Sequence, residues 1–433
     1  MTQNKMKILQ LLCVPLYGTG SGTYVRKLSE ALVEKGHEVA IAAPDKRQTD
    51  YAKVFEIKLP FMATFTGQPE HPEALLYSQM NGSKLNDIQS AFQNGIVQVV
   101  EEYKPDVIHV HHAANLSWIA NYIKAVYQIH YVITSHNTDV MNAILDKRYI
   151  PLTQDAMNRA DFITAVAKNT RERLLKILGK GFTSFTRKTK VVPCGVSVKE
   201  YSTKGSTFKI ERQYGLTNKK IALYSGKVTM IKGVDLFVKA AKSFPEMTFV
   251  VMGDGNARKD IEEIVVKQKI KNVIFTGYLG AGDKKTIADF YRLADVVVVP
   301  STVSEGIPLS ALEAMASGTP VIGSDLGGIP TAVRHMKNGI LIKPKSVSAI
   351  VEAIKTVLSN KKLYEKMSQR ARQDAVAKFD WEIIARKMEK YYKITYDRSC
   401  KNRASKKPSY VSEEEYLEDK EAVLQIKEER ERK

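Results

Sequence analysis

Apolar positions along the first half of the chain form two patterns, short continuous runs and longer stretches with an apolar residue every three or four positions. The short runs predict strands at residues 7–15, 38–43, 106–111, 131–135 and 190–193. The periodic stretches between them predict helices at 23–35, 88–103 and 116–127, and a mixed run follows at 161–178. Strands that alternate with helices in this way predict a parallel sheet with helices on both faces.

The second half repeats the alternation. Its short apolar runs predict strands at 220–225, 248–252, 272–276, 295–299, 320–322 and 340–342. Periodic segments such as 234–243 and 349–358 predict helices between them. The sequence therefore predicts an α/β protein with two doubly wound domains, whose ligands should lie in the crevice at the carboxyl ends of both sheets.

The domain boundaries follow from length and local composition. A chain of 433 residues is long for one domain, and a turn followed by the polar stretch 197–218 separates the two halves. We therefore predict an N-terminal Rossmann-like domain at 1–200 and a C-terminal one at 201–380. An amphipathic helix is predicted at 382–396, within a segment 381–400. The tail 401–433 carries both charge signs and predicts a peripheral helix or a partly disordered segment.

Two glutamates eight positions apart, Glu305 and Glu313, follow a predicted strand and flank the start of a predicted helix. Pro308 suits the first turn of that helix, which places Glu305 in the preceding loop and Glu313 inside the helix. The backbone amides of Gly306 and Ile307 would then form a seat for phosphate or sugar oxygens. The alternative is that Glu305 is a solvated loop charge and Glu313 a structural helix acid.

The net charge of +19 favours an anionic partner, which membrane lipid, nucleic acid or a phosphorylated substrate would each satisfy. Residues 168–190 combine basic and apolar side chains, which predicts either a membrane-facing patch or an ordinary surface helix with its apolar stripe inward. No apolar run approaches the roughly 18 residues that cross a bilayer. We expect a cytoplasmic protein, with peripheral contact at the inner face of the membrane as one interpretation. Three scattered cysteines indicate neither disulfides nor a zinc site.

The segment from Glu305 to Glu313 resembles the Glu-x7-Glu signature of retaining glycosyltransferases of the GT4 family, which have the GT-B fold. The resemblance extends from about residue 7 to about residue 396. It implies two Rossmann-like domains that face each other across a deep crevice. It also implies that the last helix, at 381–400, returns to the N-terminal domain.

Glycines and lysines at two strand ends extend the resemblance. The loop 18–23 is glycine-rich and leads into a helix, although its glycine spacing does not fit a dinucleotide-binding fingerprint. In the GT-B family this loop borders the donor diphosphate and the acceptor, a role that the resemblance assigns to Gly20 and Gly22. Lys227 and Lys232 lie at the mouth of the crevice, where cations neutralise a departing diphosphate. The family usually has arginine at the position of Lys227. Lysine keeps the positive charge of arginine but cannot bind phosphate in the bidentate way.

The resemblance implies further roles for single residues. His136 would touch the donor sugar, and Tyr278 would lie at the nucleotide base. Glu313 would bind the ribose, and Glu305 would lie near the sugar ring. The three histidines of a neighbouring strand are interpreted as acceptor-side or structural residues, with metal binding as a minor alternative, namely His109, His111 and His112. GT4 enzymes generally use no catalytic metal, so we expect neither a metal nor another cofactor.

The predicted reaction is transfer of a sugar from a UDP- or GDP-sugar to an acceptor hydroxyl, with retention at the anomeric carbon. Our preferred mechanism is same-face attack assisted by the leaving phosphate. Residues 61–77 are apolar and aromatic, which would suit a lipid-linked or glycan acceptor, whereas a soluble sugar phosphate or polyol is the alternative. Two alternative functions are open. One is a glycosidase, which would need no nucleotide, and the other is an inactive relative that would bind nucleotide sugar as a regulator. A basic nucleic-acid-binding protein would explain the charge, but no base-stacking aromatics accompany its arginines, so no nucleic acid is expected.

Overall fold

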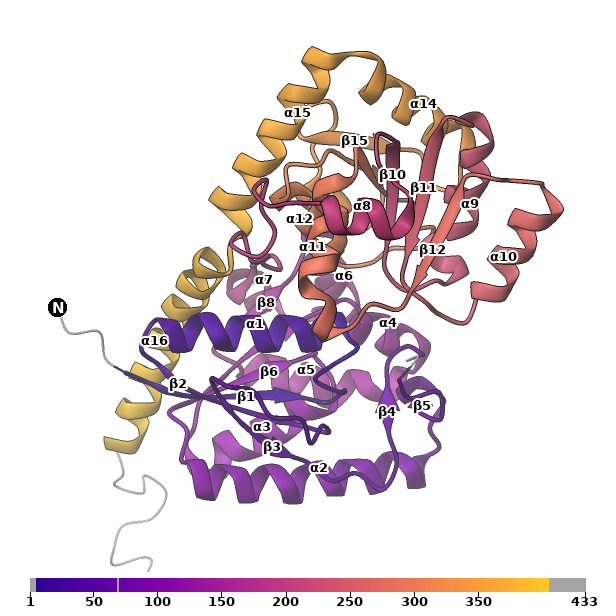
Figure 1. Cartoon of the computed structure of the whole chain (residues 1–433). Coiled ribbons are helices and arrows are strands. Elements are labelled where there is room, and N and C mark those ends of the chain that lie inside the picture. Colours follow the sequence, from indigo (N-terminus) through magenta and orange to yellow (C-terminus); the bar gives the residue numbers. More distant parts are fainter. Residues whose placement is uncertain (1–4, 68–69, 405–433) are drawn as a thin grey trace, which may run out of the picture.

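The computed structural model describes residues 5–67 and 70–404 of the 433-residue chain. It contains two α/β lobes, one above the other in Figure 1, and a row of C-terminal helices, residues 361–404, that runs along one side of both. Each lobe is built on one fully parallel sheet with helices on both faces. The predicted fold class is thereby confirmed.

The first lobe holds a seven-stranded sheet in the order β3-β2-β1-β6-β7-β8-β9. Its strands are β1 (Lys7–Leu12), β2 (Glu38–Ala43), β3 (Lys53–Glu56), β6 (Val107–His111), β7 (Tyr131–Ser135), β8 (Phe162–Ala165) and β9 (Thr189–Val191). Two short strands, β4 (Ala63–Thr64) and β5 (Leu75–Leu76), pair separately. The register of β1 sets Gln10 beside Ile41 on one side and His109 on the other. Strands β6 and β7 are buried throughout, as parallel strands covered on both faces must be.

The second lobe holds a six-stranded sheet in the order β12-β11-β10-β13-β14-β15, the doubly wound order 3-2-1-4-5-6. Its strands are β10 (Lys220–Ser225), β11 (Met247–Met252), β12 (Val273–Gly277), β13 (Val296–Val299), β14 (Val321–Ser324) and β15 (Gly339–Ile342). Strand β13 consists of four buried valines, a residue type that fits the pleated sheet. The crossover between β10 and β13 places the loops that follow these two strands side by side.

Helices cover both sheets. In the first lobe they are α1 (Gly20–Glu34), α2 (Gly82–Tyr103), α3 (Asn115–Tyr127), α4 (Thr138–Leu145), α5 (Ile150–Arg159), α6 (Lys168–Ile177) and α7 (Thr183–Lys188). In the second lobe they are α8 (Phe208–Tyr214), α9 (Val234–Ala240), α10 (Arg258–Lys267), α11 (Lys284–Leu293), α12 (Leu309–Ala316), α13 (Ile329–Ala332), α14 (Val347–Ser359) and α15 (Lys361–Asp374). Thr19 caps α1 by accepting a hydrogen bond from the amide of Gly22, 2.8 Å away.

The last helix, α16 (Trp381–Ala404), leaves the second lobe after a π-helical turn at Ala375–Phe379 and packs on α1, β6 and β7 of the first lobe. The Trp381 ring fills the space over Gly195, where an added Cβ would lie 2.4 Å from the indole. Tyr392 extends the contact through its hydroxyl, 2.6 Å from Nδ1 of His109. This helix therefore couples the two lobes.

Local details differ from the sequence expectations. The first strand ends at Leu12 instead of residue 15, and the polar stretch 197–218 contains α8. The edge strand β3 and the helices α4 and α5 were not predicted. Residues 401–404 of the predicted tail continue α16, and the rest of the tail lies outside the described residues. No helix in residues 5–67 and 70–404 is both long and apolar enough to cross a membrane.

Candidate active site

Glu305 and Lys232 form an ion pair at the carboxyl ends of two neighbouring strands. Glu305 lies in the loop after β13, and Lys232 ends a short 3-10 turn after β10. The Lys232 ammonium contacts Oε2 of Glu305, while Oε1 accepts a hydrogen bond from the Ser301 hydroxyl. The pair therefore presents one cation and one carboxylate together at the edge of the second sheet that faces the first lobe.

The turn at 325–330 holds the Glu305 loop in place. The amide of Gly328 donates to the carbonyl of Glu305 at 2.8 Å. Gly327 has φ +63°, and a Cβ there would lie 2.6 Å from the backbone nitrogen and oxygen of Glu305. Glycine is thus required at this position both for its conformation and for the close approach of the two backbones.

The start of α12 differs by one residue from the prediction. Pro308 adopts an extended conformation with φ −63° and ψ 129°, and the helix begins at Leu309. Gly306 and Ile307, predicted at the start of the helix, therefore lie in the loop before it. A Cβ at Gly306 would come within 3.1 Å of the Val166 side chain, so this loop lies directly against the first lobe.

Glu313 lies inside α12, as predicted, and its carboxylate meets tyrosine hydroxyls. Tyr291 donates to Oε2 of Glu313 at 2.6 Å, and the same hydroxyl lies 2.7 Å from Oγ of Ser225. Burial raises the pKa of Glu313 to about 7, against the lowering effect of hydrogen bonds from Tyr291 and Tyr201. Sequence reasoning did not find these tyrosines, because they lie 22 and 112 positions away in the chain.

His136 follows β7 and lies opposite the Glu305 loop. Its neighbour Asn137 donates through Nδ2 to the carbonyl of Ser304 at 3.4 Å, and Asn169 donates to the Ser304 hydroxyl at 3.2 Å. Burial lowers the pKa of His136 to about 3, so this imidazole is neutral at physiological pH. The structure thus brings the loops of His136 and Glu305 together across the two lobes.

The neighbouring histidines form a buried cluster behind His136. His109 is fully buried, and its Nε2 lies 2.6 Å from Oγ1 of Thr134. The rings of His109 and His111 lie 4.1 Å apart, and the ring of His112 lies 4.8 Å from that of His136. Within the described part of the chain, no group of three or more histidine, cysteine, aspartate or glutamate residues could hold a metal ion.

Lys227 and Tyr278 reach from the second lobe to the loop around residue 70 of the first. Nζ of Lys227 donates to the carbonyl of Gly67 at 3.3 Å, and the Tyr278 hydroxyl donates to Oε1 of Glu70 at 3.0 Å. Burial, with a smaller contribution from the nearby Lys232 ammonium, lowers the pKa of Lys227 to about 8. Both predicted donor-binding residues therefore lie where the lobes meet.

Gly20 and Gly22 of the glycine-rich loop differ in their surroundings. Gly20 is exposed at the first position of α1, and a Cβ there would meet nothing within 4 Å. Gly22 is buried, and a Cβ there would lie 2.2 Å from the carbonyl oxygen of Leu16. The loop thus contains one glycine with open space beside it and one that the fold itself requires.

Two family models together span most of the chain. Residues 18–200 match the model described as Glycosyltransferase Family 4, and residues 206–374 match Glycosyl transferases group 1. The chain belongs to the GT4 family of group 1 glycosyltransferases.

Relatives and solved structures agree with this assignment. This glycosyltransferase is 26% identical over 400 residues to an uncharacterised glycosyltransferase of Methanocaldococcus jannaschii, with 87% of this chain and 95% of the relative covered. It is 24% identical to the N-acetyl-alpha-D-glucosaminyl L-malate synthase of Bacillus anthracis, with 91% and 98% covered. An Anabaena protein solved with UDP and glucose shares the fold, at a TM-score of 0.70 and 18% identity over 90% of this chain and all of that one.

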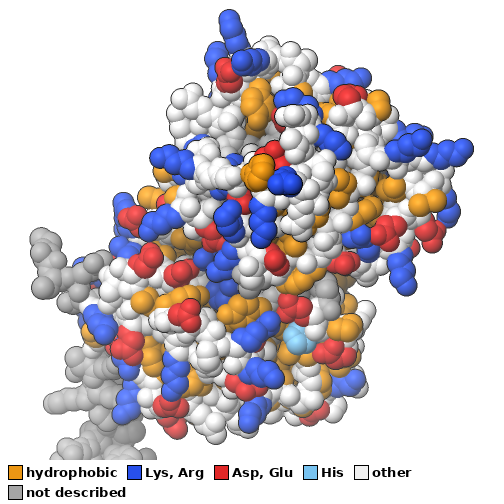
Figure 2. Space-filling model, in the orientation of Figure 1, with side chains coloured by type: hydrophobic (Ala, Val, Ile, Leu, Met, Phe, Trp, Pro, Cys, Tyr) orange, Lys and Arg blue, Asp and Glu red, His pale blue; other side chains and the backbone are white. Residues whose placement is uncertain are grey.

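The basic stretch 168–190 of this glycosyltransferase folds as α6, α7 and β9. Its residues Leu174, Leu178 and Phe185 are fully buried in the first lobe. The structure therefore favours the surface-helix interpretation over a membrane-facing apolar stripe. Figure 2 shows lysine and arginine side chains spread over both lobes on the visible face, with acidic side chains among them.

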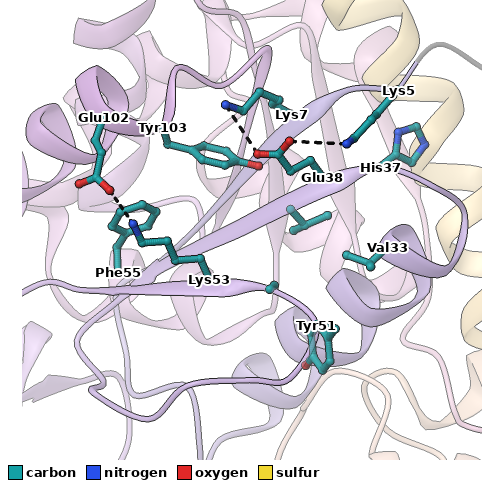
Figure 3. A pocket seen from close by; sticks show the side chains of 12 residues that line it. Lys5, Lys7, Val33, His37, Glu38, Tyr51, Lys53, Phe55, Glu102 and Tyr103 are labelled. Atoms are coloured by element: carbon teal, nitrogen blue, oxygen red, sulfur yellow. Dashed lines mark hydrogen bonds and ion pairs between the residues drawn. The ribbon is translucent and has the colours of Figure 1, made fainter.

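A depression of about 460 Å³ lies at the opposite end of the first sheet, where β1, β2 and β3 begin (Figure 3). Its lysines are engaged by acids that line the same depression. Lys5 and Lys7 pair with Glu38 at 3.7 and 3.6 Å, and Lys53 pairs with Glu102 at 2.5 Å. The carboxyl ends of the strands, not this depression, carry the residues predicted for sugar transfer.

Proposed function

We propose that this glycosyltransferase moves a sugar from a nucleotide diphosphate sugar to an acceptor hydroxyl with retention at the anomeric carbon. The observation that carries the proposal is the Lys232–Glu305 ion pair, which lies across from the loop of His136. In this assignment Lys232 and Lys227 stabilise the departing diphosphate, because preorganised cations lower the energy of the charge that develops there. Glu305 and His136 hold the sugar, and Glu313 binds the ribose.

The nucleotide is proposed to lie along the second lobe. Tyr278 would lie at the base, and the loop amides of Gly306 and Ile307 together with Gly20 and Gly22 would border the diphosphate or the sugar. An Anabaena neighbour of the same fold was solved with UDP and glucose, which supports a nucleotide sugar as donor. No metal takes part in the proposed mechanism.

The acceptor is proposed to be either a lipid-linked glycan or a soluble small molecule such as a sugar phosphate or polyol. The relative from Bacillus anthracis is named an N-acetyl-alpha-D-glucosaminyl L-malate synthase, and L-malate is a small soluble acid. This name favours the soluble class. Domain closure around both substrates would exclude water from the reaction.

The decisive experiment measures nucleotide release from a panel of UDP-, GDP- and ADP-sugars, with and without candidate acceptors. We expect slow release from one donor alone, and loss of that release in Glu305→Ala. Failure of every donor to bind in calorimetry would refute the proposed function. Release of sugar from simple glycosides in the absence of a nucleotide would instead indicate a glycosidase.

Contact with an anionic membrane stays a prediction, and we propose residues 144–152 as the contact surface. Residues 144–152 expose Leu145 to 70% and Leu152 to 55%, beside the exposed Lys147 and Arg148. We expect the protein to sediment with vesicles that contain phosphatidylglycerol, and we expect Leu145→Ser to weaken this binding while Val266→Ser, at an equally exposed position of the second lobe, does not. Absence of sedimentation in the wild type would refute the prediction.

The pKa of Glu313 predicts a pH dependence of donor binding. A ribose hydroxyl donates best to an ionised carboxylate, and a pKa of about 7 means that Glu313 becomes protonated as the pH falls from 8 to 6. The donor KM should therefore rise about tenfold over this range in the wild type. In Glu313→Gln the KM should be high at every pH, and a KM that still titrated in this variant would assign the effect to another group.

The same shift has a consequence for stability. The pKa of Glu313 in the folded protein lies above its ordinary value of 4.5, so the folded state binds more protons between pH 4.5 and about 7. The contribution of Glu313 to stability is therefore present below this window and is lost as the pH rises through it.

A further inference from the structure

A hydrogen-bonded chain runs from the interior of the first sheet to His136. Gln10 in β1 accepts at Oε1 a hydrogen bond from Nε2 of His111 in β6, over 2.7 Å. Nδ1 of His111 lies 3.1 Å from Nε2 of His136. Gln10 and His111 are both fully buried, whereas His136 is partly exposed. The three residues form a relay. Gln10, at its inner end, is shielded from solvent, and His136, at its outer end, lies at the crevice.

The chemistry of the three groups fixes where the protons lie. A neutral imidazole carries one N–H, and an amide oxygen only accepts hydrogen bonds. The proton of His111 therefore lies on Nε2, and its Nδ1 can only accept. The hydrogen bond between the two rings then requires a proton on Nε2 of His136. Nδ1 of His136 is left with a lone pair.

The histidines of the cluster are neutral at physiological pH. Burial lowers the pKa of His109, His111 and His112 well below 6.5, with neighbouring histidines adding to the effect for each. His109 is engaged separately by Thr134 and by Tyr392 of α16, both at 2.6 Å.

Two further groups face His136 from the elements packed against it. Asp139 accepts the backbone amide of His136 at 3.2 Å and the amide of Ala113 at 2.7 Å, so its oxygens are engaged by the backbone. Burial raises the pKa of Asp139. The Tyr24 ring meets His136 edge-on at 5.0 Å, and burial raises the pKa of its hydroxyl far above the neutral range. The Asp139 carboxyl group is therefore engaged by backbone amides, and the Tyr24 hydroxyl keeps its proton near neutral pH.

We propose that Gln10 and His111 are positioning residues that hold His136 in its Nε2–H tautomer, so that Nδ1 accepts a hydrogen bond from a hydroxyl of the donor sugar. The proposal rests on the proposed sugar-binding role of His136. It specifies a hydrogen-bond acceptor at the sugar, which selects a hydroxyl-bearing donor at that position over a deoxy sugar. It also gives the side-chain oxygen of Gln10 a hydrogen-bond partner at the centre of a buried sheet, where an unpaired oxygen would be costly.

The first test is imidazole ¹⁵N NMR of the full-length protein without substrate, with the His136 signals assigned from the spectrum of His136→Gln. Protonated and unprotonated ring nitrogens resonate in separate regions, so the tautomer is read directly. We expect Nε2 of His136 to be protonated and Nδ1 unprotonated, with no titration between pH 5 and 8. A protonated Nδ1 in the wild type would overturn the proposal.

The second test changes the inner end of the relay. Gln10→Glu favours protonation of His111, which would then donate from Nδ1 and move the proton of His136 to Nδ1. Gln10→Met keeps the volume and removes the acceptor. Gln98→Glu is the matched control, because it adds the same charge at an exposed position of α2. Thermal unfolding of all three variants distinguishes a loss of folded structure from a change in the tautomer of His136.

Activity decides whether the tautomer matters for sugar transfer. We expect kcat/KM for nucleotide release to fall about 10- to 100-fold in Gln10→Glu and Gln10→Met, the cost of one mismatched buried hydrogen bond, with the control unchanged. Unchanged ¹⁵N shifts of His136 in Gln10→Glu would overturn the relay. Changed ¹⁵N shifts of His136 with an unchanged kcat/KM would overturn the role of the His136 tautomer in binding the sugar. A wild type with the expected shifts but no donor binding would refute the proposed function and leave the tautomer assignment standing.

Discussion

Replacing Lys232 by alanine should lower kcat for nucleotide release about 100- to 1,000-fold, the usual cost of removing one preorganised charge-stabilising group. The Lys232 ammonium contacts Glu305 at the carboxyl ends of β10 and β13, where the departing diphosphate is proposed to gain charge. The substitution removes this cation and also leaves the Glu305 carboxylate with Ser301 as its remaining side-chain partner. Because the loss falls on the transition state, we expect kcat to change far more than the donor KM.

Single-turnover nucleotide release measures this effect, and the chain supplies a matched control. Lys239 lies seven residues further on, pairs with Asp235 at 2.8 Å, and has a side chain 32% exposed, against 33% for Lys232. Lys239→Ala should leave kcat unchanged, and Lys232→Arg should restore part of it. Equal rates in Lys232→Ala and Lys239→Ala would remove Lys232 from the mechanism.

The sequence predicted the architecture because local periodicity is enough for parallel α/β folds. Buried strands such as β13 read as continuous apolar runs, and their helices carry an apolar residue every three or four positions. Strand β3 escaped prediction because it is a short edge strand with charged residues at both ends, Lys53 and Glu56. Helix α8 escaped because its stretch is polar, with Ile210 as its one buried residue.

The sequence also pointed to the loops of the site but not to the pairs within it. Glu305, Lys232 and His136 each follow a predicted strand, so their position at the crevice follows from topology. The contact of Lys232 with Glu305 spans 73 residues and depends on the crossover between β10 and β13, which no local pattern encodes. The relay from Gln10 to His111 spans 101 residues for the same reason.

The basic stretch 168–190 shows a second limit of sequence reasoning. Its spacing of apolar residues is equally compatible with burial in the fold and with contact with lipid, and only tertiary packing distinguishes the two. The structure buries Leu174 and Phe185. Three exposed apolar residues, Ile144, Leu145 and Leu152, lie instead at 144–152, a segment that periodicity did not single out.

The glycine-rich loop yields the last prediction, because its two proposed donor-binding glycines should respond in opposite ways to the same substitution. Gly22→Ala should lower the free energy of unfolding by about 1–3 kcal/mol, since the new Cβ would lie 2.2 Å from the Leu16 carbonyl oxygen and force the backbone apart. Gly20→Ala adds its methyl to open space at the start of α1 and should leave stability unchanged or slightly higher.

Thermal unfolding and donor KM together separate the two roles. If the donor diphosphate passes beside Gly20, its alanine variant should show a donor KM raised several-fold at wild-type stability, because the methyl occupies space that the phosphate needs. Gly82→Ala, at the open first position of α2, is the control for adding a methyl to a helix start. A normal donor KM in Gly20→Ala would mean that this loop borders the acceptor or only shapes the fold. The diphosphate would then rest on Lys227, Lys232 and the Gly306 loop alone.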